Sequence, residues 1–238
     1  MSTTPSPGMT PSTHPPARVP TVHLVDDEAS VRDALAFLFQ SHGLHARGHA
    51  SGPAFLDVVD HDPAALAGCI LLDVRMEPMS GLQVHDALVE RAVGLPVLFL
   101  TGHGDIPMAV EALKKGAFDF VEKPFVADAL VQRVQRALAV DEARQAADSE
   151  EGERHARLAS LSEREREVMV RVAAGKLNKV IADELDIAVR TVEVHRARVF
   201  GKLGVRSAAE VATLLAASGV APLHTPGGMS RGRRSDPT

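Results

Sequence analysis

Short apolar runs in the first half of the chain end in residues suited to phosphoryl transfer. One run ends at Asp26 and Asp27, a second at Asp73, a third at Thr101, and a fourth reaches Lys123. Runs of this length, separated by stretches of helical periodicity, predict buried parallel strands that alternate with helices. The carboxyl ends of such strands share one edge of the sheet. The sequence therefore predicts three carboxylates, a hydroxyl and an ammonium group in one crevice.

This set of side chains suits a divalent cation and an acyl phosphate. Three carboxylates at one edge repel one another strongly unless a cation joins them. Mg²⁺ takes oxygen ligands and keeps several waters, so two or three carboxylates and a backbone carbonyl are sufficient. One carboxylate can attack phosphorus, and the Lys123 ammonium can pair with the transferred oxygens. Taken singly, Asp26 and Asp27 fit a helix cap, Asp73 a turn and Lys123 a solvated loop.

Apolar residues at helical spacing lie between the strand-like runs. One helix is predicted after Asp27, with Ser30 or Asp27 as its cap and Gly43 at its end. A short run at about 46–50 supplies a fifth strand. We therefore expect an α/β domain with a doubly wound, flavodoxin-like sheet of five parallel strands. The apolar helix faces comprise Val31, Ala34, Leu35 and Leu38; Leu82, His85, Ala87, Leu88 and Ala92; Met108, Ala109, Ala112 and Leu113; and Leu130, Val134 and Leu138.

The same residues stand in motifs that resemble the receiver domain of two-component response regulators. The motifs are Asp26-Asp27, Leu72-Asp73-Val74-Arg75-Met76, Leu100-Thr101-Gly102-His103-Gly104-Asp105 and Glu122-Lys123-Pro124-Phe125. The resemblance implies that a sensor histidine kinase phosphorylates Asp73. It also implies that Asp27, Asp73 and the backbone carbonyl of Arg75 hold Mg²⁺, with Asp26 acting mainly through water.

The resemblance assigns the switch to three further residues. Thr101 follows the phosphoryl group, Lys123 pairs with it, and Phe120 stands at the aromatic position that rotates inward on activation. Phosphorylation adds about two negative charges and three acceptor oxygens at one strand end. Such a change can bias a two-state loop and helix.

The loop after Asp73 departs from the family pattern, which is usually Met-Pro-x-Met-[Ser/Asp]-Gly. This chain has Met76-Glu77-Pro78-Met79-Ser80-Gly81, so Glu77 stands where a proline is usual. An extra carboxylate there is expected to change cation affinity without abolishing phosphorylation. Arg75 and His103 lie two residues beyond the acceptor and the threonine, at positions that set phosphoryl lifetime in this family. The alternative is that both are solvated loop side chains.

Charge divides the chain into domains. Residues 21–138 carry 9 Lys and Arg against 16 Asp and Glu, whereas residues 160–218 carry 10 against 8. We expect an acidic domain at 21–138, a charged linker at 139–159 and a mildly basic domain at 160–218. Residues 1–20 and 219–238 are expected to be disordered tails. One domain with a solvated insertion is the alternative.

The basic domain has the pattern of a helix-turn-helix protein. Ser162 and Glu165 form a predicted capping box, and Gly175 ends the helix that follows. The short turn that precedes the third helix, Asp186-Ile187-Ala188, separates two helices of which the second is rich in basic residues. Later helices are expected at Asn178–Leu185, about Val189–Leu203 and, after a cap at Ser207, to about Ala217.

The third of these helices has two faces. An apolar face is expected to pack inward, and comprises Val192, Val199, Phe200 and Leu203. The opposite face is free to enter a major groove, where Glu193 can accept from cytosine and Val194 or Ala197 can contact a thymine methyl. Lys179, Thr191 and His195 are placed to contact phosphates. The groove-facing residues are Arg190, Glu193, Val194, Ala197 and Arg198.

This segment resembles the LuxR-type DNA-binding domain. The matching stretches are Leu161–Val168, Gly175–Ala182 and Thr191–His195. A receiver followed by this domain is the arrangement of NarL/FixJ-type response regulators. The residues of the motifs resemble the FixJ branch more than the NarL branch. Ala188 departs from the usual Ser or Thr cap of the recognition helix, at a cost of about 1 kcal/mol, and Gly201 adds a similar weakness.

Three other classes of protein share parts of this pattern. Haloacid-dehalogenase phosphatases need an acidic residue two places after the nucleophile, where this chain has Arg75. Quorum-sensing LuxR regulators use ligand pockets rich in Trp and Tyr, and this chain has neither. A DNA-binding protein with an inactive receiver is the third, and Glu77 is its only support.

The sequence thus predicts a transcription factor rather than an enzyme, whose only reactions are phosphorylation at Asp73 and slow autodephosphorylation. Its expected partners are a sensor histidine kinase, double-stranded DNA, RNA polymerase and, once phosphorylated, a second copy of itself. The dimer is expected to form through the 106–116 helix and the strand ending at Lys123. One cysteine, no apolar stretch of about 20 residues and no signal peptide favour the cytoplasm and no membrane partner.

Overall fold

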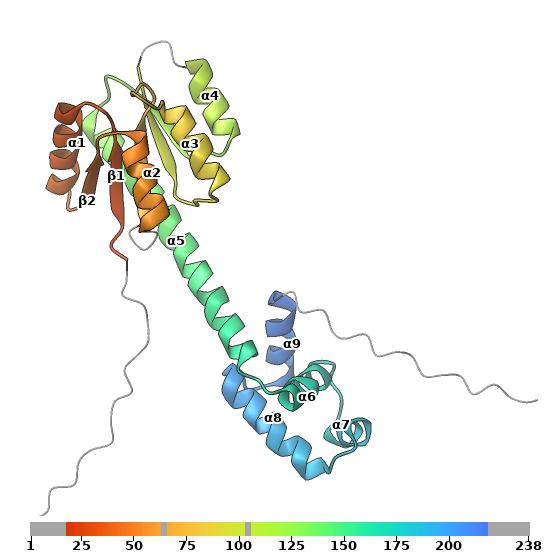
Figure 1. Ribbon diagram of the computed structural model, residues 1–238. Coiled ribbons are helices and arrows are strands. Elements are labelled where there is room, and N and C mark those ends of the chain that lie inside the picture. Colours follow the sequence, from red (N-terminus) through yellow and green to blue (C-terminus); the bar gives the residue numbers. More distant parts are fainter. Residues whose placement is uncertain (1–17, 63–65, 103–105, 219–238) are drawn as a thin grey trace, which may run out of the picture. The chain divides into compact units, whose positions relative to one another are not determined.

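The computed structural model describes residues 18–62, 66–102 and 106–218. The chain forms two compact units, which divide between Ala146 and Ala147 (Figure 1). Within the described ranges, none of the helices combines the length and apolar character needed to cross a membrane.

The first unit is built on a parallel sheet, and the prediction of five parallel strands is confirmed. The strands follow the order β2-β1-β3-β4-β5, in which every neighbouring pair is parallel. This is the flavodoxin-like order. In sheets of this kind, ligands bind in the crevice at the carboxyl ends of the strands. The strands are β1 (Thr21–Val25), β2 (His45–His49), β3 (Gly68–Asp73), β4 (Val97–Thr101) and β5 (Asp119–Glu122), and the helices are α1 (Ala29–Ser41), α2 (Gly52–His61), α3 (Gly81–Glu90), α4 (Ile106–Lys114) and α5 (Ala127–Ala159).

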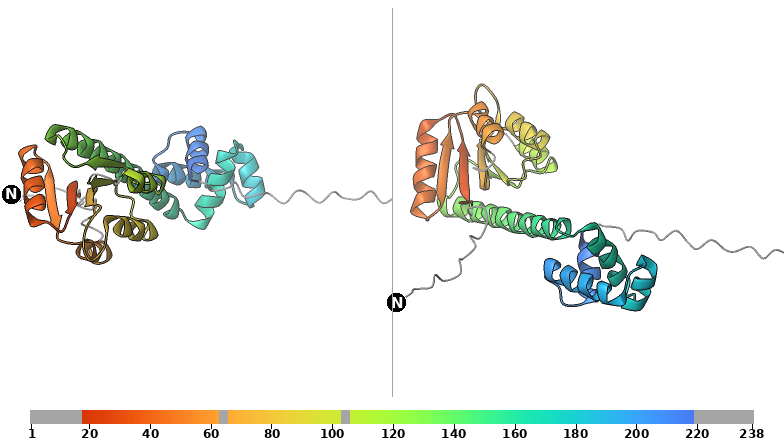
Figure 2. Two further views of the ribbon diagram at one scale, coloured as in Figure 1. Left: turned by 90° about the horizontal axis from the view of Figure 1, so that it is seen from above. Right: turned by 60° about the horizontal axis from the view of Figure 1, so that its bottom comes forward.

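Helices cover both faces of the sheet, as Figure 2 shows from two further directions. One core joins the sheet to α1 and α5 through residues such as Phe39 and Val134. The other core joins it to α2, α3 and α4 through residues such as Phe55 and Leu88. All six residues of β3 are buried, which explains why this strand reads as a continuous apolar run.

Two details of the helices differ from the prediction. Neither Ser30 nor Asp27 caps α1, because Glu28 holds the cap position and makes no capping hydrogen bond. The Asp26 carboxylate instead accepts a 2.8 Å hydrogen bond from the Glu28 backbone N–H, which tightens the turn before the helix. Ala92 lies beyond the end of α3, with a left-handed φ of 53°, and so is not part of its apolar face.

Helix α5 extends well past the sheet. It runs for 33 residues and includes all of the segment 139–159 that the sequence predicts as a charged linker. Its buried face ends with a carboxylate, Asp141, which is 1% exposed. The division between the two compact units falls inside this helix.

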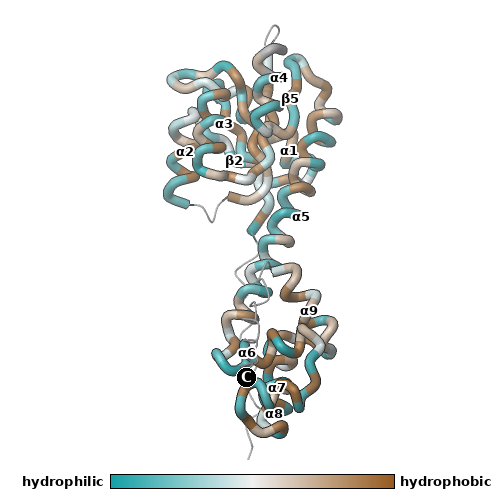
Figure 3. Tube along the Cα trace, turned by 90° about the vertical axis from the view of Figure 1, so that its right-hand side faces the viewer, coloured by the Kyte–Doolittle hydropathy of each residue, from teal (hydrophilic) through white to brown (hydrophobic). Residues whose placement is uncertain are grey.

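The second unit is helical, and the predicted helix positions are confirmed. Ser162 and Glu165 form the capping box of the first helix, and Gly204 ends the third with a left-handed φ of 69°. Figure 3 shows hydrophobic and hydrophilic residues alternating along α8, whose apolar side packs into two neighbouring cores. The helices are α6 (Glu163–Ala173), α7 (Asn178–Leu185), α8 (Val189–Leu203) and α9 (Ala208–Ala217).

Candidate functional site

Three charged side chains meet at the carboxyl edge of the sheet. Lys123 Nζ lies 2.6 Å from Asp73 Oδ1 and 3.4 Å from Asp26 Oδ2. The Asp26 side chain is 3% exposed and that of Asp73 11%, so both carboxylates are largely removed from water. The second Asp73 oxygen accepts a 2.8 Å hydrogen bond from the Arg75 backbone N–H. Asp73 is therefore held in one orientation by two donors.

Burial and ion pairing oppose each other at this site. Burial raises the pKa of the Asp73 carboxyl above its ordinary value, although the hydrogen bond and charge of Lys123 act in the opposite direction. Burial disfavours the charged form of Lys123, but its hydrogen bond with Asp73 and the negative charges of Asp73 and Asp26 outweigh this and raise the pKa of the ammonium. Lys123 thus stays protonated at neutral pH, as the counter-charge of two acidic groups.

Asp27 lies at the rim of the site. Its side chain accepts a 3.3 Å hydrogen bond from the backbone N–H of Glu77, in the loop that follows β3. Among the described residues, no three His, Cys, Asp or Glu side chains are arranged to hold a metal ion. The donors available at this edge are nonetheless carboxylate oxygens, with three acidic side chains against one ammonium, which suits a hard divalent cation. Asp26, Asp27 and Asp73 are the residues that could hold it.

Of the predicted switch residues, Thr101 lies next to these charges and Phe120 lies in the adjoining core. Thr101 ends β4 and is buried, and its backbone carbonyl accepts a 2.7 Å hydrogen bond from the Lys123 N–H. Phe120 is half-buried and packs against the core under α4. Arg75 is exposed after β3, whereas His103 lies outside the described residues.

A groove opens beside this edge of the sheet. It has a volume of about 490 Å³ and is bounded by Asp27, by the loop 74–80 and by Met108 of α4. Glu77 lines this groove together with Asp27, and it stands where the family pattern has a proline.

The predicted DNA-reading helix, α8, has the expected two faces. Val192 and Val199 are fully buried and Leu203 is 1% exposed, while Phe200 is half-buried beneath the Arg196 guanidinium. The side chains predicted to enter a groove all lie on the exposed face: Arg190, Glu193, Val194, Ala197 and Arg198.

The predicted phosphate contacts near α8 differ in exposure. Lys179 is exposed on α7, and Thr191 and His195 are half-buried on α8. His195 Nδ1 is buried and has no hydrogen-bond partner among the described residues.

Comparison with protein families matches the two halves separately. Residues 22–135 match the response regulator receiver domain, and residues 159–215 match the bacterial regulatory proteins of the LuxR family. The chain is 52% identical over 196 residues to the C4-dicarboxylate transport transcriptional regulatory protein DctR of Rhodobacter capsulatus, covering 82% of this chain and 98% of DctR. This protein is a FixJ-like response regulator.

Further relatives agree with this membership. The response regulator is 43% identical to the transcriptional regulatory protein FixJ of Rhizobium meliloti, over 85% of this chain and 98% of FixJ. The solved structure of the response regulator StyR matches with a TM-score of 0.76 and 37% identity, over 83% of this chain and 98% of StyR. Full-length FixJ from B. japonicum matches with a TM-score of 0.52 and 39% identity, over 85% and 98% of the two chains. The protein is therefore a transcription factor with a receiver and a LuxR-type DNA-binding domain.

Sequence reasoning missed two supporting residues of this response regulator. Arg32, on α1, donates a 2.7 Å hydrogen bond to the Asp26 backbone carbonyl and so fixes the loop that carries the acidic pair. Arg196, on α8, donates a 3.0 Å hydrogen bond to the Asn178 side chain and so ties the two helices of the helix-turn-helix together. Both contacts join separate elements. The separation of the partners along the chain gives no signal from which either contact could be predicted.

Proposed function

We propose that this response regulator is switched by a phosphoryl group that a sensor histidine kinase transfers to Asp73. The observation that carries the proposal is the 2.6 Å contact between Lys123 Nζ and Asp73 Oδ1 at the open edge of the sheet. A fixed ammonium beside the acceptor can pair with phosphoryl oxygens, which arrive with negative charge.

The proposed transfer is a displacement at phosphorus. A carboxylate oxygen of Asp73 forms a bond to phosphorus while the bond from phosphorus to a histidine nitrogen of the kinase breaks. The electron pair of that bond stays on the imidazole. Lys123 keeps its proton and shifts its contact from the free carboxylate to the transferred oxygens. The hydroxyl of Thr101, at the end of β4, is proposed to follow them.

Mg²⁺ is part of this proposal. The residues that would hold it are Asp27, Asp73 and the backbone carbonyl of Arg75, with Asp26 contributing mainly through water. When bound, the ion neutralises negative charge on the phosphoryl oxygens. The donor set supports this, since all its members are oxygens and the acidic groups outnumber the single ammonium of Lys123.

The output of the switch is proposed to be DNA binding by a dimer. The dimer would form through the face that contains α4 and β5, and so present two copies of α8 to a two-fold site. The exposed face of α8, with Arg190, Glu193 and Arg198, supports a major-groove contact. RNA polymerase is the further partner that a transcription factor of this kind requires.

The deciding experiment is phosphate incorporation from acetyl phosphate with and without Mg²⁺, on the native chain and on Asp73→Asn, with light scattering in parallel. Because the chain has no Trp and no Tyr, its concentration is measured by refractive index. Labelling that requires Mg²⁺ and Asp73, together with conversion of monomer to dimer, is the expected result. A chain that takes up no phosphate under any of these conditions would refute the proposal.

The lifetime of the phosphoryl group is proposed to depend on Arg75 and His103. Replacing each residue with Ala and timing the loss of label tests this assignment directly. An unchanged lifetime in both variants would show that neither residue has this role.

A further inference from the structure

Four polar atoms of Asp26, the first residue of the acidic pair, are held by separate parts of the receiver. The two side-chain oxygens accept hydrogen bonds from the Glu28 N–H at 2.8 Å and from Lys123 Nζ at 3.4 Å. The backbone N–H donates to the His49 carbonyl at 3.3 Å, and the backbone carbonyl accepts from Arg32 Nη1 at 2.7 Å. Asp26 is 2% exposed, so water cannot readily replace a partner that is lost here.

Arg32 differs from the other partners because it holds the peptide unit that joins Asp26 to Asp27. The carbonyl that it binds belongs to this unit, whose six atoms lie close to one plane. Fixing the direction of the carbonyl therefore fixes the rotation of the whole unit, and with it the direction in which the Asp27 side chain leaves the backbone. One hydrogen bond thus orients both members of the acidic pair.

The stem of Arg32 is placed by a glycine of a neighbouring strand. Arg32 lies in the first turn of α1 and is half-buried. A Cβ atom at Gly48, on β2, would lie 3.5 Å from Arg32 Cδ and 3.7 Å from its Nε, so the stem passes over the open side of this glycine. Gly48 pairs with Leu24 of β1, two residues before Asp26. The guanidinium is therefore supported by the strand next to the one that leads into the acidic pair.

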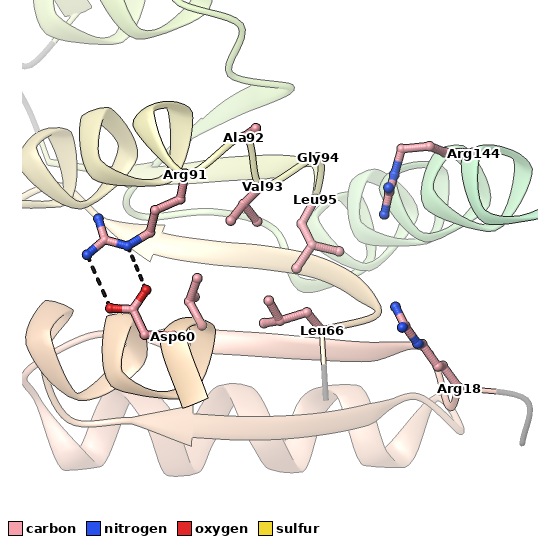
Figure 4. Close-up of a pocket in the computed structure, with 10 residues that line it drawn as sticks. Arg18, Asp60, Leu66, Arg91, Ala92, Val93, Gly94, Leu95 and Arg144 are labelled. Atoms are coloured by element: carbon pink, nitrogen blue, oxygen red, sulfur yellow. Dashed lines mark hydrogen bonds and ion pairs between the residues drawn. The ribbon is translucent and has the colours of Figure 1, made fainter. Parts of the chain in front are cut away.

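The bond that Arg32 makes is of an unusual kind for an arginine. Arg91 shows the ordinary kind, because it binds both carboxylate oxygens of Asp60, at 2.8 and 3.2 Å (Figure 4). Such forked pairs combine charge with geometry. Arg32 instead gives a short hydrogen bond to an uncharged carbonyl of a residue that carries a carboxylate. The contact thus fixes the backbone rather than neutralising the acid.

The charge and the geometry of Arg32 have opposite effects on a cation at the acidic pair. A positive charge close to the carboxylates repels a divalent cation, so the charge alone weakens Mg²⁺ binding. A fixed peptide unit keeps the carboxylates in one arrangement, which favours Mg²⁺ because this ion demands nearly ideal octahedral geometry. The two effects therefore predict changes of opposite sign when Arg32 is removed.

We propose that Arg32 is a positioning residue of the receiver, which sets the affinity for Mg²⁺ by orienting the peptide unit between Asp26 and Asp27. The inference rests on the proposed function, since that function assigns Mg²⁺ to the acidic residues. It adds that a residue bound to a backbone carbonyl of the site controls the cation affinity, and that it does so against the effect of its own charge.

The test is a titration of the full, unphosphorylated chain with MgCl₂ at constant ionic strength, followed by ¹H–¹⁵N NMR at the amides of Asp26, Asp27 and Asp73. Arg32→Gln, whose side chain is too short to reach the carbonyl, should weaken Mg²⁺ binding about tenfold. Arg32→Lys keeps the charge and a shorter donor, so its affinity should fall between the two. Arg47→Gln, which removes an exposed arginine of β2, should not weaken Mg²⁺ binding.

A second signal separates positioning from a general loss of stability. The amide N–H of Asp27 belongs to the same peptide unit as the carbonyl that Arg32 binds. Its resonance should therefore shift in Arg32→Gln before any Mg²⁺ is added, whereas it should stay in place in Arg47→Gln. An Asp27 amide that keeps its native shift in Arg32→Gln would show that the arginine does not hold this peptide unit.

The remaining outcomes are equally decisive. Unchanged or tighter Mg²⁺ binding in Arg32→Gln would overturn the proposal, because only the charge of the arginine would then matter. If Arg32→Gln does not fold, native affinity in Arg32→Lys overturns it in the same way. Equal weakening in Arg32→Gln and Arg47→Gln would remove the special role of Arg32. A native chain without saturable shifts would refute the Mg²⁺ site of the proposed function itself, whereas native binding that no variant alters would refute this inference alone.

Discussion

The carboxylate of Asp141, on α5, accepts a 2.7 Å hydrogen bond from the backbone N–H of Gly68, where β3 begins. The same carboxylate binds Arg144 at 2.6 Å and Gln145 at 2.5 Å, and it is 1% exposed. This buried carboxylate has three hydrogen-bond donors. It attaches the segment of α5 that follows the buried apolar residues to the start of β3. Since β3 also carries Asp73, this contact connects the long helix to the strand that ends in the proposed phosphoacceptor.

Asp141→Ala should destabilise the first unit by about 3 kcal/mol, because it removes the buried acceptor of the Gly68 N–H and an ion-pair partner of Arg144. The measurement is native-state amide exchange in β1 and β3, which reports the free energy of opening of this unit. Glu142→Ala is the matched control, since Glu142 is the exposed neighbour on the same helix, and it should change the free energy by less than about 0.5 kcal/mol. Equal protection in the two variants would contradict this role for Asp141.

Acid should destabilise the first unit through a buried histidine pair. His23 Nδ1 and His49 Nε2 lie 3.1 Å apart, and both rings pack against Phe55. Burial, followed by the charges of His23 and Arg47, lowers the pKa of His49 from 6.5 to about 4. At pH values between these two pKa values, His49 binds a proton in the unfolded chain but not in the folded chain. The stability present above pH 6.5 is therefore lost as the pH falls toward 4, by an amount on the order of 3 kcal/mol.

Replacing the histidine tests this pH dependence. His49→Phe removes the ionisable group but keeps a ring beside Phe55, so the free energy of unfolding should fall less between pH 6.5 and 4.5 than in the native chain. Urea unfolding followed by far-ultraviolet circular dichroism provides the measurement. His61→Phe, at an exposed position on α2, should lose as much free energy of unfolding over this pH range as the native chain. A pH profile that is the same for His49→Phe and the native chain would rule out His49 as the source.

Lys123→Gln should slow phosphate incorporation from acetyl phosphate by about 100-fold, because removing one charge-stabilising donor from a buried reaction site costs about this much. The substitution also removes the group that opposes the burial-driven rise in the pKa of Asp73. Labelling should then require a higher pH than in the native chain, since only the ionised carboxylate attacks phosphorus. Lys115→Gln is the control, because it breaks an exposed 2.7 Å ion pair with Asp86, which involves neither Asp73 nor Asp26. Native rates and an unshifted pH profile in Lys123→Gln would exclude this function for the lysine.

The sequence predicted the architecture well where an element has an uninterrupted apolar pattern. The strands that end near Asp73 and Thr101 follow from buried runs, and the helices of the second unit follow from caps such as Ser162 and ends such as Gly204. The convergence of Asp26, Asp73 and Lys123 followed from topology, because the ends of parallel strands share one edge. What strand topology could not fix was the side-chain direction of Asp27, which lies toward Glu77.

The contacts that sequence reasoning missed connect elements far apart in the chain. The sequence pattern did not reveal helix α2, although Ser51 caps it and a proline occupies its first turn. Asp141 follows Val134 and Ala137 on the buried face of α5, and an acidic residue at that spacing was a usable signal. A cavity of about 440 Å³ that Arg18, Arg91 and Arg144 line (Figure 4) had no such signal, because its residues come from separate segments.

Ala188→Ser should stabilise α8. Ala188 holds the cap position in an extended conformation with φ of −70° and ψ of 145°, but it makes no side-chain hydrogen bond. A serine hydroxyl there can accept a hydrogen bond from a backbone N–H of the first turn, which is worth about 1 kcal/mol. Amide exchange along α8 measures the gain. Ala197→Ser, in the exposed middle of the helix, should instead cost about 0.5 kcal/mol, and a gain at both positions would contradict capping as the cause.

Two substitutions on the helix-turn-helix should separate affinity from specificity. Lys179→Ala removes an exposed cation on α7 that is proposed to bind phosphate, so it should weaken binding to all sequences alike and reduce the slope of log K against log salt by about 1. Glu193→Gln changes an exposed side chain on α8 that is proposed to accept a hydrogen bond from a base. It should keep the salt slope but relax the preference at one base pair by about 1–3 kcal/mol. The measurement is fluorescence anisotropy of the phosphorylated chain on a site selected from random DNA, with single base-pair variants of that site. The assigned roles would be wrong if Lys179→Ala altered the preference at one base pair. They would also be wrong if Glu193→Gln weakened binding to every DNA sequence equally.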